Sequence, residues 1–178
     1  MIDLMEEKAY WHVVYTASRA EKKVEERLLK SGVECYLAVR TVVRQWTHRK
    51  SKVVVPVIAR MIFVRVGRSE QVKVLEIQGV VSFLKVRGES RPAIIPDRQL
   101  ESFRFLLDLA PESFEISNEH LAVGDFVEVV KGPLMGLKGE LLRLRGETKV
   151  AVRIECLGCA LVDIPASYVE RIGAEFIE

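Results

Sequence analysis

A polar stretch at residues 110–119 divides the chain into two halves with different patterns. The stretch has few apolar residues and contains Pro111 and three glutamates. Such a composition is typical of a linker between domains. A chain of 178 residues with 49% hydrophobic content is long and apolar enough for two small cores. We therefore expect a first domain over 1–109, a linker over 110–119 and a second domain over 120–178.

The first half opens with a strand followed by an amphipathic helix. Tyr10–Thr16 is rich in aromatic and β-branched residues, which favours a strand. Ser18 and Glu21 have the spacing of a capping box, and Gly32 is placed to end the helix. Apolar residues recur at steps of four on one helical face: Ala20, Val24 and Leu28.

The rest of this half alternates strands and helices. Strand-like segments are followed by a short helix and a further strand: Glu34–Val43 and Val53–Val66, with a polar connection over Trp46–Lys52, then a helix over Ser69–Ile77 and a strand over Val80–Val86. Asp97 can begin a third helix, whose apolar face is Leu100, Phe103, Leu106 and Leu107. This order predicts an α+β domain with an antiparallel sheet and flanking helices.

The second half contains only short strand candidates. They are divided by turns that contain glycine: Phe126–Val130, Glu140–Arg145, Lys149–Cys156 and Cys159–Ile164. Close spacing of this kind predicts a small all-β barrel. Its many valines favour strands, so we expect a barrel in the free protein.

Charge is distributed unevenly between the halves. Residues 1–108 hold 20 Lys and Arg against 13 Asp and Glu, whereas residues 109–178 hold 7 against 12. The asymmetry indicates that only the first half works beside nucleic acid. Met1–Lys8 lacks the basic and apolar regions of a signal peptide, and no apolar run approaches the roughly 20 residues of a spanning helix. We expect a soluble, cytoplasmic monomer that does not bind membranes.

The cysteines and the polar residues do not favour an enzyme. Cys156 and Cys159 have the spacing of a zinc or redox motif, but further ligands are scarce, and small buried strand residues are the alternative. No Ser/His/Asp set, phosphate-binding loop or paired metal carboxylates stand out. We expect no enzyme activity, no cofactor and no metal.

Two motifs resemble those of a known family. The stretch Val123–Leu144 looks like a KOW motif, and the opening residues Trp11–Tyr15, with Glu21–Val24 and Leu28, resemble the NusG amino-terminal domain. Together they resemble a NusG family transcription elongation and antitermination factor, with an SH3-like KOW barrel as its second domain. The segment Arg44–Lys50, followed by Pro56, Phe63 and Val64, is most similar to the UpxY group of RfaH-like antiterminators. Ala59-Arg60-Met61 stands where the family usually has Pro-Gly-Tyr.

The resemblance implies an apolar surface that binds RNA polymerase at the clamp helices of its largest subunit. Carried over by position, this surface is Trp11, Tyr15, Ile58, Met61, Phe63 and Val86; core residues are the alternative. Alternation along the strand places Met61 and Phe63 together, opposite Ile62 and Val64, and we expect both to be uncovered. A second polymerase contact is expected at Glu70, Gln71, Val72 and Lys73.

Basic residues indicate nucleic-acid contacts in the first half. A run without acidic residues suits phosphate contact and base stacking, although a solvated hairpin would look the same: Arg44, Trp46, Arg49, Lys50 and Lys52. By family position, Arg19, Lys22 and Lys23 lie where RfaH-like proteins touch the non-template DNA strand. In the KOW domain, Phe126 and Leu157 match positions that hold a ribosomal protein or the termination factor Rho.

We therefore expect an operon-specific factor that suppresses pausing and termination through binding alone. Two other classes stay open. A ribosome-associated RNA-binding protein would carry its basic surface on the KOW barrel, and a thiol redox or zinc enzyme would use Cys156 and Cys159.

Overall fold

The computed structural model describes residues 8–46, 49–111, 113–117, 124–144, 146–154 and 157–173. The chain forms two compact units, residues 1–97 and residues 98–178, and each is described by itself. Among the described residues, no helix has both the length and the apolar character needed to cross a membrane.

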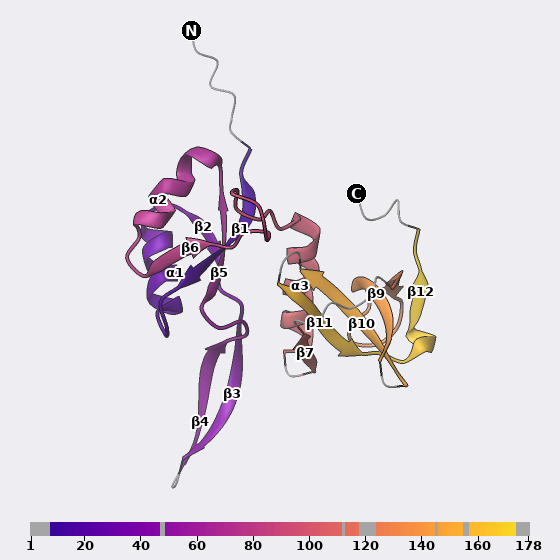
Figure 1. The fold of residues 1–178 in the computed structure, drawn as a ribbon. Coiled ribbons are helices and arrows are strands. Elements are labelled where there is room, and N and C mark those ends of the chain that lie inside the picture. The colour runs from indigo at the N-terminus through magenta and orange to yellow at the C-terminus, as the bar shows by residue number, and fades with distance from the viewer. Residues whose placement is uncertain are drawn as a thin grey trace. The chain divides into compact units, whose positions relative to one another are not determined.

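The first unit is built on a four-stranded antiparallel sheet with the order β2-β5-β1-β6. Its strands are β1 (Tyr10–Thr16), β2 (Glu34–Tyr36), β5 (Met61–Val66) and β6 (Val80–Phe83). Two helices accompany the sheet (Figure 1): α1 (Glu21–Lys30) and α2 (Gln71–Glu76), the latter preceded by the short 3-10 helix η1 (Arg68–Glu70).

The core of this unit lies between the helices and one face of the sheet. Ile62 and Val64 of β5 pack in one buried cluster with Val24 and Leu28 of α1 and Val74 of α2. Their alternation along β5 confirms the predicted division of this strand into two faces. The predicted apolar stripe of the first helix is also confirmed.

The helix α1 begins differently from the prediction. Its N-cap is Ala20 and no side chain caps it, so the capping box expected from Ser18 is wrong. The Glu21 carboxylate instead accepts a hydrogen bond from the backbone N–H of Arg60 at 2.8 Å. At the other end, Gly32 has a φ of +74°, the left-handed conformation expected of a residue that ends a helix.

The strands β3 (Val39–Trp46) and β4 (Arg49–Pro56) form a separate two-stranded ribbon. The ribbon projects away from the four-stranded sheet of the same unit (Figure 1). The pairing of β3 with β4 continues as far as Trp46, which lies opposite Arg49. The polar connection expected over Trp46–Lys52 is therefore largely strand. Polar residues are tolerated there because side chains near the ribbon tip are exposed on both faces.

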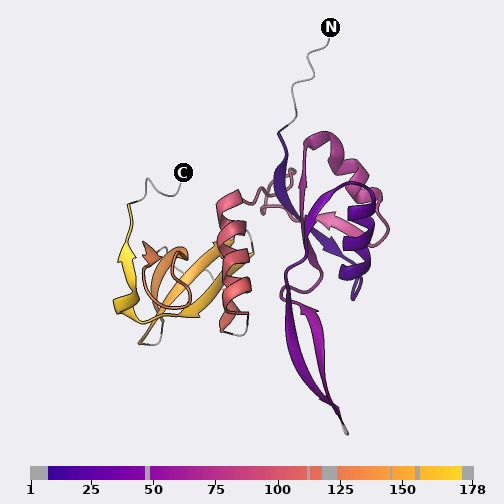
Figure 2. The same ribbon diagram turned by 180° about the vertical axis from the view of Figure 1, so that it is seen from behind.

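The second unit contains a helix and a six-stranded antiparallel sheet (Figure 2). The helix is α3 (Asp97–Leu109), and its predicted apolar face, Leu100, Phe103, Leu106 and Leu107, is buried. The sheet order is β12-β8-β9-β10-β11-β7. The four predicted strands are β8 (Asp125–Val129), β9 (Lys138–Leu144), β10 (Glu147–Ile154) and β11 (Gly158–Asp163). The remaining two are β7 (Phe114–Ser117) and β12 (Val169–Arg171), which follows the 3-10 helix η2 (Ala166–Tyr168).

The region before β8 differs from the expected linker over 110–119. Strand β7 lies inside that stretch and pairs with β11, with Phe114 opposite Val162. The Phe114 ring packs edge-on against Phe103 of α3, with 6.3 Å between the ring centroids. Because this aromatic contact and the strand pairing tie α3 and β7 to the sheet, the compact division falls near residue 97 and not near 109. The functional assignment of residues 1–109 and 120–178 stays a prediction.

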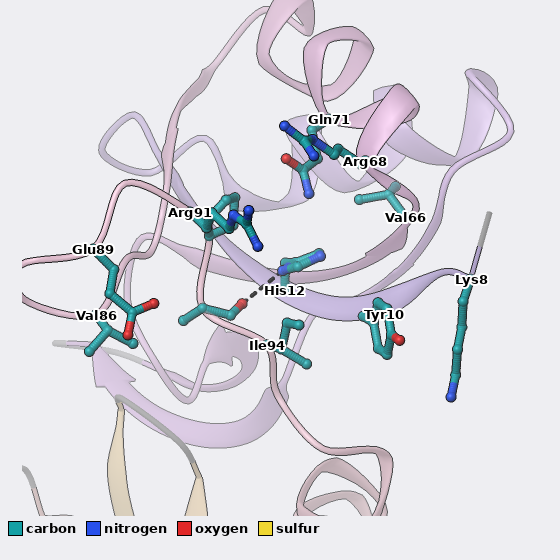
Figure 3. A pocket seen from close by; sticks show the side chains of 12 residues that line it. Lys8, Tyr10, His12, Val66, Arg68, Gln71, Val86, Glu89, Arg91 and Ile94 are labelled. Carbon is teal, nitrogen blue, oxygen red and sulfur yellow. Dashed lines mark hydrogen bonds between the residues drawn. The ribbon is translucent and has the colours of Figure 1, made fainter.

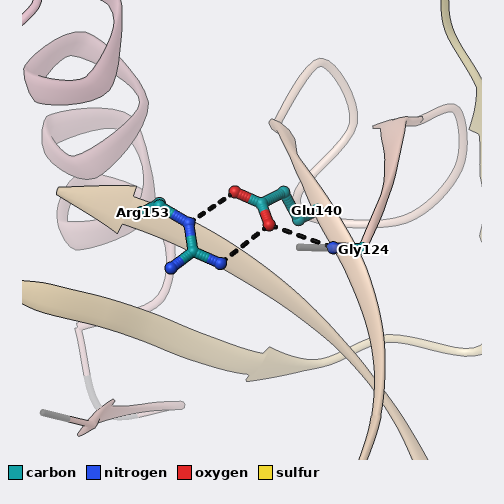
Figure 4. Close-up of polar contacts among 3 residues, drawn as sticks. All are labelled: Gly124, Glu140 and Arg153. Atoms are coloured by element: carbon teal, nitrogen blue, oxygen red, sulfur yellow. Dashed lines mark hydrogen bonds and ion pairs between the residues drawn. The ribbon is translucent and has the colours of Figure 1, made fainter. Parts of the chain in front are cut away.

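An ion pair joins two neighbouring strands of this sheet (Figure 4). Glu140 of β9 is 5% exposed, and its two carboxylate oxygens accept hydrogen bonds from Arg153 of β10. One of them also accepts a hydrogen bond from the backbone N–H of Gly124 at 3.2 Å. The carboxylate is therefore satisfied by donors from two segments, as a buried charge requires.

Candidate interaction surfaces

The face of the four-stranded sheet that points away from the α1 and α2 cluster contains Tyr15 and Met61. Their Cα atoms are direct partners across β1 and β5, and both side chains are half-buried. Two more of the expected residues keep exposed surface, since Ile58 is half-buried and Val86 is 37% exposed. We call the adjacent pair Tyr15 and Met61 the outer apolar patch. Val86 lines the pocket described below.

Two residues expected on the same surface are covered. Phe63 is 1% exposed and Trp11 is 4% exposed, so the expectation that Met61 and Phe63 are both uncovered is correct only for Met61. The Tyr36 ring of β2 lies beside Phe63, with 6.0 Å between centroids. The Arg65 guanidinium lies 6.0 Å from the Trp11 ring centroid. A direct role of either residue in binding a partner stays a prediction.

Three connections of the first unit are joined by hydrogen bonds at the end of the sheet where β1 leads into α1. The backbone N–H of Thr16 donates to the carbonyl of Arg60 at 2.8 Å, and that of Ala17 donates to the carbonyl of Gly79 at 2.8 Å. Arg19 and Arg60 have φ angles of +60° and +62°. This left-handed conformation costs a residue with a side chain roughly 1–2 kcal/mol. We call Arg19, Lys23 and Arg60 the loop-end basic group.

The predicted basic residues Arg19, before α1, and Lys22 and Lys23, in its first turn, have different surroundings. Lys22 donates to the carbonyl of Val54 on β4 at 2.9 Å, so its ammonium is tied to the base of the ribbon. Arg19 and Lys23 are exposed, and within the described part of the chain neither side chain forms a hydrogen bond or an ion pair. The nucleic-acid contact expected at these three residues stays a prediction, and Arg60 is not among the residues expected from the sequence. A signal was present, because Arg60 occupies the glycine position of the family's Pro-Gly-Tyr triplet.

The predicted basic residues of the ribbon are exposed but lie on two faces. Cross-strand pairing places Lys50 and Lys52 on the face of Gln45 and Val43. Arg44 and Arg49 lie on the opposite face. The Trp46 backbone belongs to β3, while its side chain, like Thr47 and His48, lies outside what the structure describes. The ribbon tip thus presents positive charge in both directions.

An open pocket of about 580 Å³ lies at the other end of β1 (Figure 3). His12 lies among its lining residues and donates from Nδ1 to the Ala93 carbonyl at 2.7 Å, which leaves Nε2 as the remaining ring nitrogen. Cationic side chains outnumber acidic ones around it, with Lys8, Arg68 and Arg91 against Glu89. The pocket therefore favours an acidic or strongly hydrogen-bonding group.

The expected second polymerase contact borders this pocket. Gln71 is one of the lining residues, and Val72 is 62% exposed. Lys73 is exposed as well. The Glu70 carboxylate already has a local partner, because it accepts a hydrogen bond from the backbone N–H of Gly67 at 3.0 Å.

In the second unit, the two predicted partner-binding residues are accessible in part. Phe126 of β8 and Leu157, in the turn between β10 and β11, are both half-buried.

Cys159 is buried, which raises the pKa of its thiol, and Cys156 lies outside the described residues. Burial also raises the pKa of the Cys35 thiol to about 11. Among the residues described, no group of three or more His, Cys, Asp or Glu is placed to hold a metal ion.

Comparison with known families identifies the family of the chain through the first unit and the start of α3. The profile of the family described as "NusG: Transcription termination factor nusG" matches residues 9–104, more than half of the chain. The chain belongs to the NusG family. It is therefore a transcription elongation factor of this family and not an enzyme, and membership implies that it binds RNA polymerase.

Two solved structures resemble the chain along most of its length. A structure of the domain interaction in Thermotoga maritima NusG is 26% identical, covers 93% of this chain and 98% of the other, and gives a TM-score of 0.43. The crystal structure of the MjSpt4:Spt5 complex in conformation A is 15% identical, covers 92% and 98%, and gives a TM-score of 0.30. A search of curated protein sequences finds no match.

Proposed function

We propose that this NusG-family protein is an operon-specific antitermination factor of the UpxY and RfaH-like type. It binds the clamp helices of the largest polymerase subunit, suppresses pausing and termination, and recruits a partner through its second unit. Binding biases the polymerase clamp toward its closed form, because a ligand shifts an equilibrium by its difference in affinity for the two states.

The outer apolar patch is the observation that carries this proposal. Tyr15 and Met61 sit side by side on the sheet face that the α1 and α2 cluster does not use, and both keep exposed surface. An apolar patch of this kind suits a pair of helices that lay their apolar faces against it. Trp11 and Phe63 are buried, so they add little exposed surface to this face.

Nucleic acid and a second polymerase segment are assigned to separate parts of the first unit. The exposed basic residues of α1 and of the ribbon favour contact with the non-template DNA strand. The pocket bordered by Gln71 favours a second polymerase contact, because its excess of cationic side chains attracts an acidic loop. Specificity for particular operons would come from the ribbon, whose Arg44–Lys50 segment is the one similar to the UpxY group.

The second unit is assigned the recruiting role. Phe126 on β8 and Leu157 in the turn between β10 and β11 each offer half-buried apolar surface, which suits a ribosomal protein or Rho as partner. A small apolar contact surrounded by polar surface is typical of a transient interface.

A matched pair of variants tests the polymerase contact. Met61→Gln replaces a half-buried apolar side chain of the outer apolar patch with a polar one of similar size. Leu29→Gln makes the same kind of change at a side chain of α1 that is 58% exposed. Retention on immobilised RNA polymerase is expected to fall several-fold for Met61→Gln and to stay at the wild-type level for Leu29→Gln. Equal retention of all three proteins would refute the assignment of this patch.

A further inference from the structure

Arg60 combines an unfavourable backbone conformation with an exposed cationic side chain. Its φ of +62° is one that glycine or asparagine adopts at lower cost. Arg19, in the β1–α1 connection, has nearly the same angle. Strained positions of this kind are a reason to look for a function of the side chain.

Hydrogen bonds on both sides fix the Arg60 backbone. Its N–H donates to the Glu21 carboxylate at 2.8 Å, and its carbonyl accepts from the backbone N–H of Thr16 at 2.8 Å. Glu21 is itself 7% exposed, so this anchor is shielded from water. Thr16 and Glu21 are the two ends of the connection that contains Arg19, and Arg60 is therefore held against that connection.

The side chain of Arg60 is oriented by its inner nitrogen. Nε donates to the carbonyl of Thr16 at 3.2 Å, while the two terminal nitrogens bond to none of the described residues. Arg60 is exposed. A guanidinium held at Nε presents its outer N–H groups as a fixed fork, which matches the two oxygens of a phosphate.

The local charge favours an anion at this place. Arg19 and Lys23 add two exposed cations, whereas Glu21 is buried and already bonded to Arg60. Lys22 contributes less, since its ammonium is occupied by the Val54 carbonyl. The loop-end basic group thus has three cationic side chains. Among the described residues, the only side-chain bond that they form is the one from Arg60 to the Thr16 carbonyl.

We infer that Arg60 binds a phosphodiester group of a single DNA strand, together with Arg19. The inference extends the nucleic-acid surface of the proposed function, on which it rests, to a residue outside α1 and the ribbon. In this assignment the left-handed backbone aims the guanidinium, and the strain is the consequence of that placement.

The test separates a contact to phosphate from a purely structural role. In Arg60→Gln, the side-chain nitrogen Nε2 is as many bonds from Cα as the arginine Nε, so the donor to Thr16 is kept while the charge and the fork are lost. Binding of the full-length protein to a labelled single-stranded DNA oligonucleotide of mixed sequence is measured at several salt concentrations. Arg87→Gln removes one exposed cation from a turn of the same unit and is the matched control.

For Arg60→Gln we expect an unchanged melting temperature and an affinity about 3- to 10-fold weaker at low salt. The salt dependence should lose about 0.7 units of slope, the share of one phosphate on a single strand. Arg60→Gly, which suits the backbone angle, should weaken binding equally without loss of stability. Wild-type affinity of Arg60→Gln, or an equal loss for Arg87→Gln, would overturn the inference.

The same variant distinguishes this inference from the proposed function. Arg60→Gln is expected to be retained on RNA polymerase like the wild type. If the wild type itself is not retained, the proposed function fails, while the difference in oligonucleotide binding still decides the role of Arg60.

Discussion

Arg153 holds Glu140 through two hydrogen bonds, from Nε to Oε1 at 2.7 Å and from a terminal nitrogen to Oε2 at 2.9 Å. The pair joins β10 to β9, and the further bond from the Gly124 N–H joins the segment before β8 to the same carboxylate. One buried acid thus fixes three segments of the six-stranded sheet. Such a contact makes the second unit sensitive to loss of one partner, since the other charge is then left without compensation.

Replacing Glu140 with alanine is therefore expected to destabilise the second unit by about 2–3 kcal/mol, because the Arg153 charge and the Gly124 N–H lose their acceptor. Asp125→Asn is the control, since Asp125 pairs with Arg171 through exposed side chains and its loss should change little. Urea denaturation monitored by circular dichroism measures both variants. Equal stability of Glu140→Ala and the wild type would show that the ion pair adds nothing.

Two glycines with similar backbone angles allow steric crowding to be separated from backbone strain. Gly79 and Gly88 have φ angles of +100° and +89°. A Cβ at Gly79 would lie 2.7 Å from Cγ2 of Val24 in the core, whereas a Cβ at Gly88 would meet no atom within 4 Å. We expect Gly88→Ala to cost about 1 kcal/mol and Gly79→Ala to cost about 2–4 kcal/mol. Thermal unfolding of the two variants measures the difference, and equal costs would contradict the account of how the Gly79 connection packs on α1.

Glu25 provides a test with a defined pH direction. Burial raises the pKa of its carboxyl above the usual value, with smaller opposing effects from a Leu37 backbone hydrogen bond and from Lys22. A raised pKa in the folded state means that the folded protein binds the proton more tightly, so folding loses stability as the pH rises from the unfolded-state pKa through the folded-state pKa. Glu25→Gln should therefore be more stable than the wild type at neutral pH, and this advantage should disappear at acidic pH. Denaturation curves at pH 4 and pH 7 measure it; a larger advantage at the acidic value would reverse the assigned sign.

Patterns within one strand or one helix were sufficient to predict much of the fold. The bounds of β1 match the aromatic and β-branched run, and Ile62 and Val64 lie on the core face as the alternation predicts. The apolar face of α3 is buried as its spacing predicts. These features depend on side-chain periodicity, which is local in sequence.

Features that depend on partners distant in sequence were not predicted. The Ser18 capping box fails because Glu21 bonds to Arg60, 39 residues away. Phe63 was expected to be exposed, but Tyr36 of the neighbouring strand packs beside it. β7 was taken for a linker because its pairing with β11 joins residues more than 40 positions apart. A polar composition does not prevent a short edge strand from forming when its backbone finds a partner.

For the candidate site, the structure reports exposure and contacts, and the binding roles stay predictions. Family position indicated Tyr15 and Met61 on the sheet and the basic residues at the start of α1 and just before it, and the structure leaves surface exposed at each of them. Family position alone did not indicate that the Lys22 ammonium donates a hydrogen bond to the Val54 carbonyl. It also did not indicate that Arg60 is hydrogen-bonded to Thr16, in the connection that leads to Arg19. Both depend on how separate connections meet at one end of the sheet.

Single-round transcription in vitro on a template with a strong pause site tests the central claim most directly. Purified RNA polymerase is followed with no factor, with the wild type, with Met61→Gln and with Leu29→Gln. We predict that the wild type and Leu29→Gln shorten the pause several-fold and that Met61→Gln leaves it close to the value without factor. A pause of the same length in all four reactions would contradict the account.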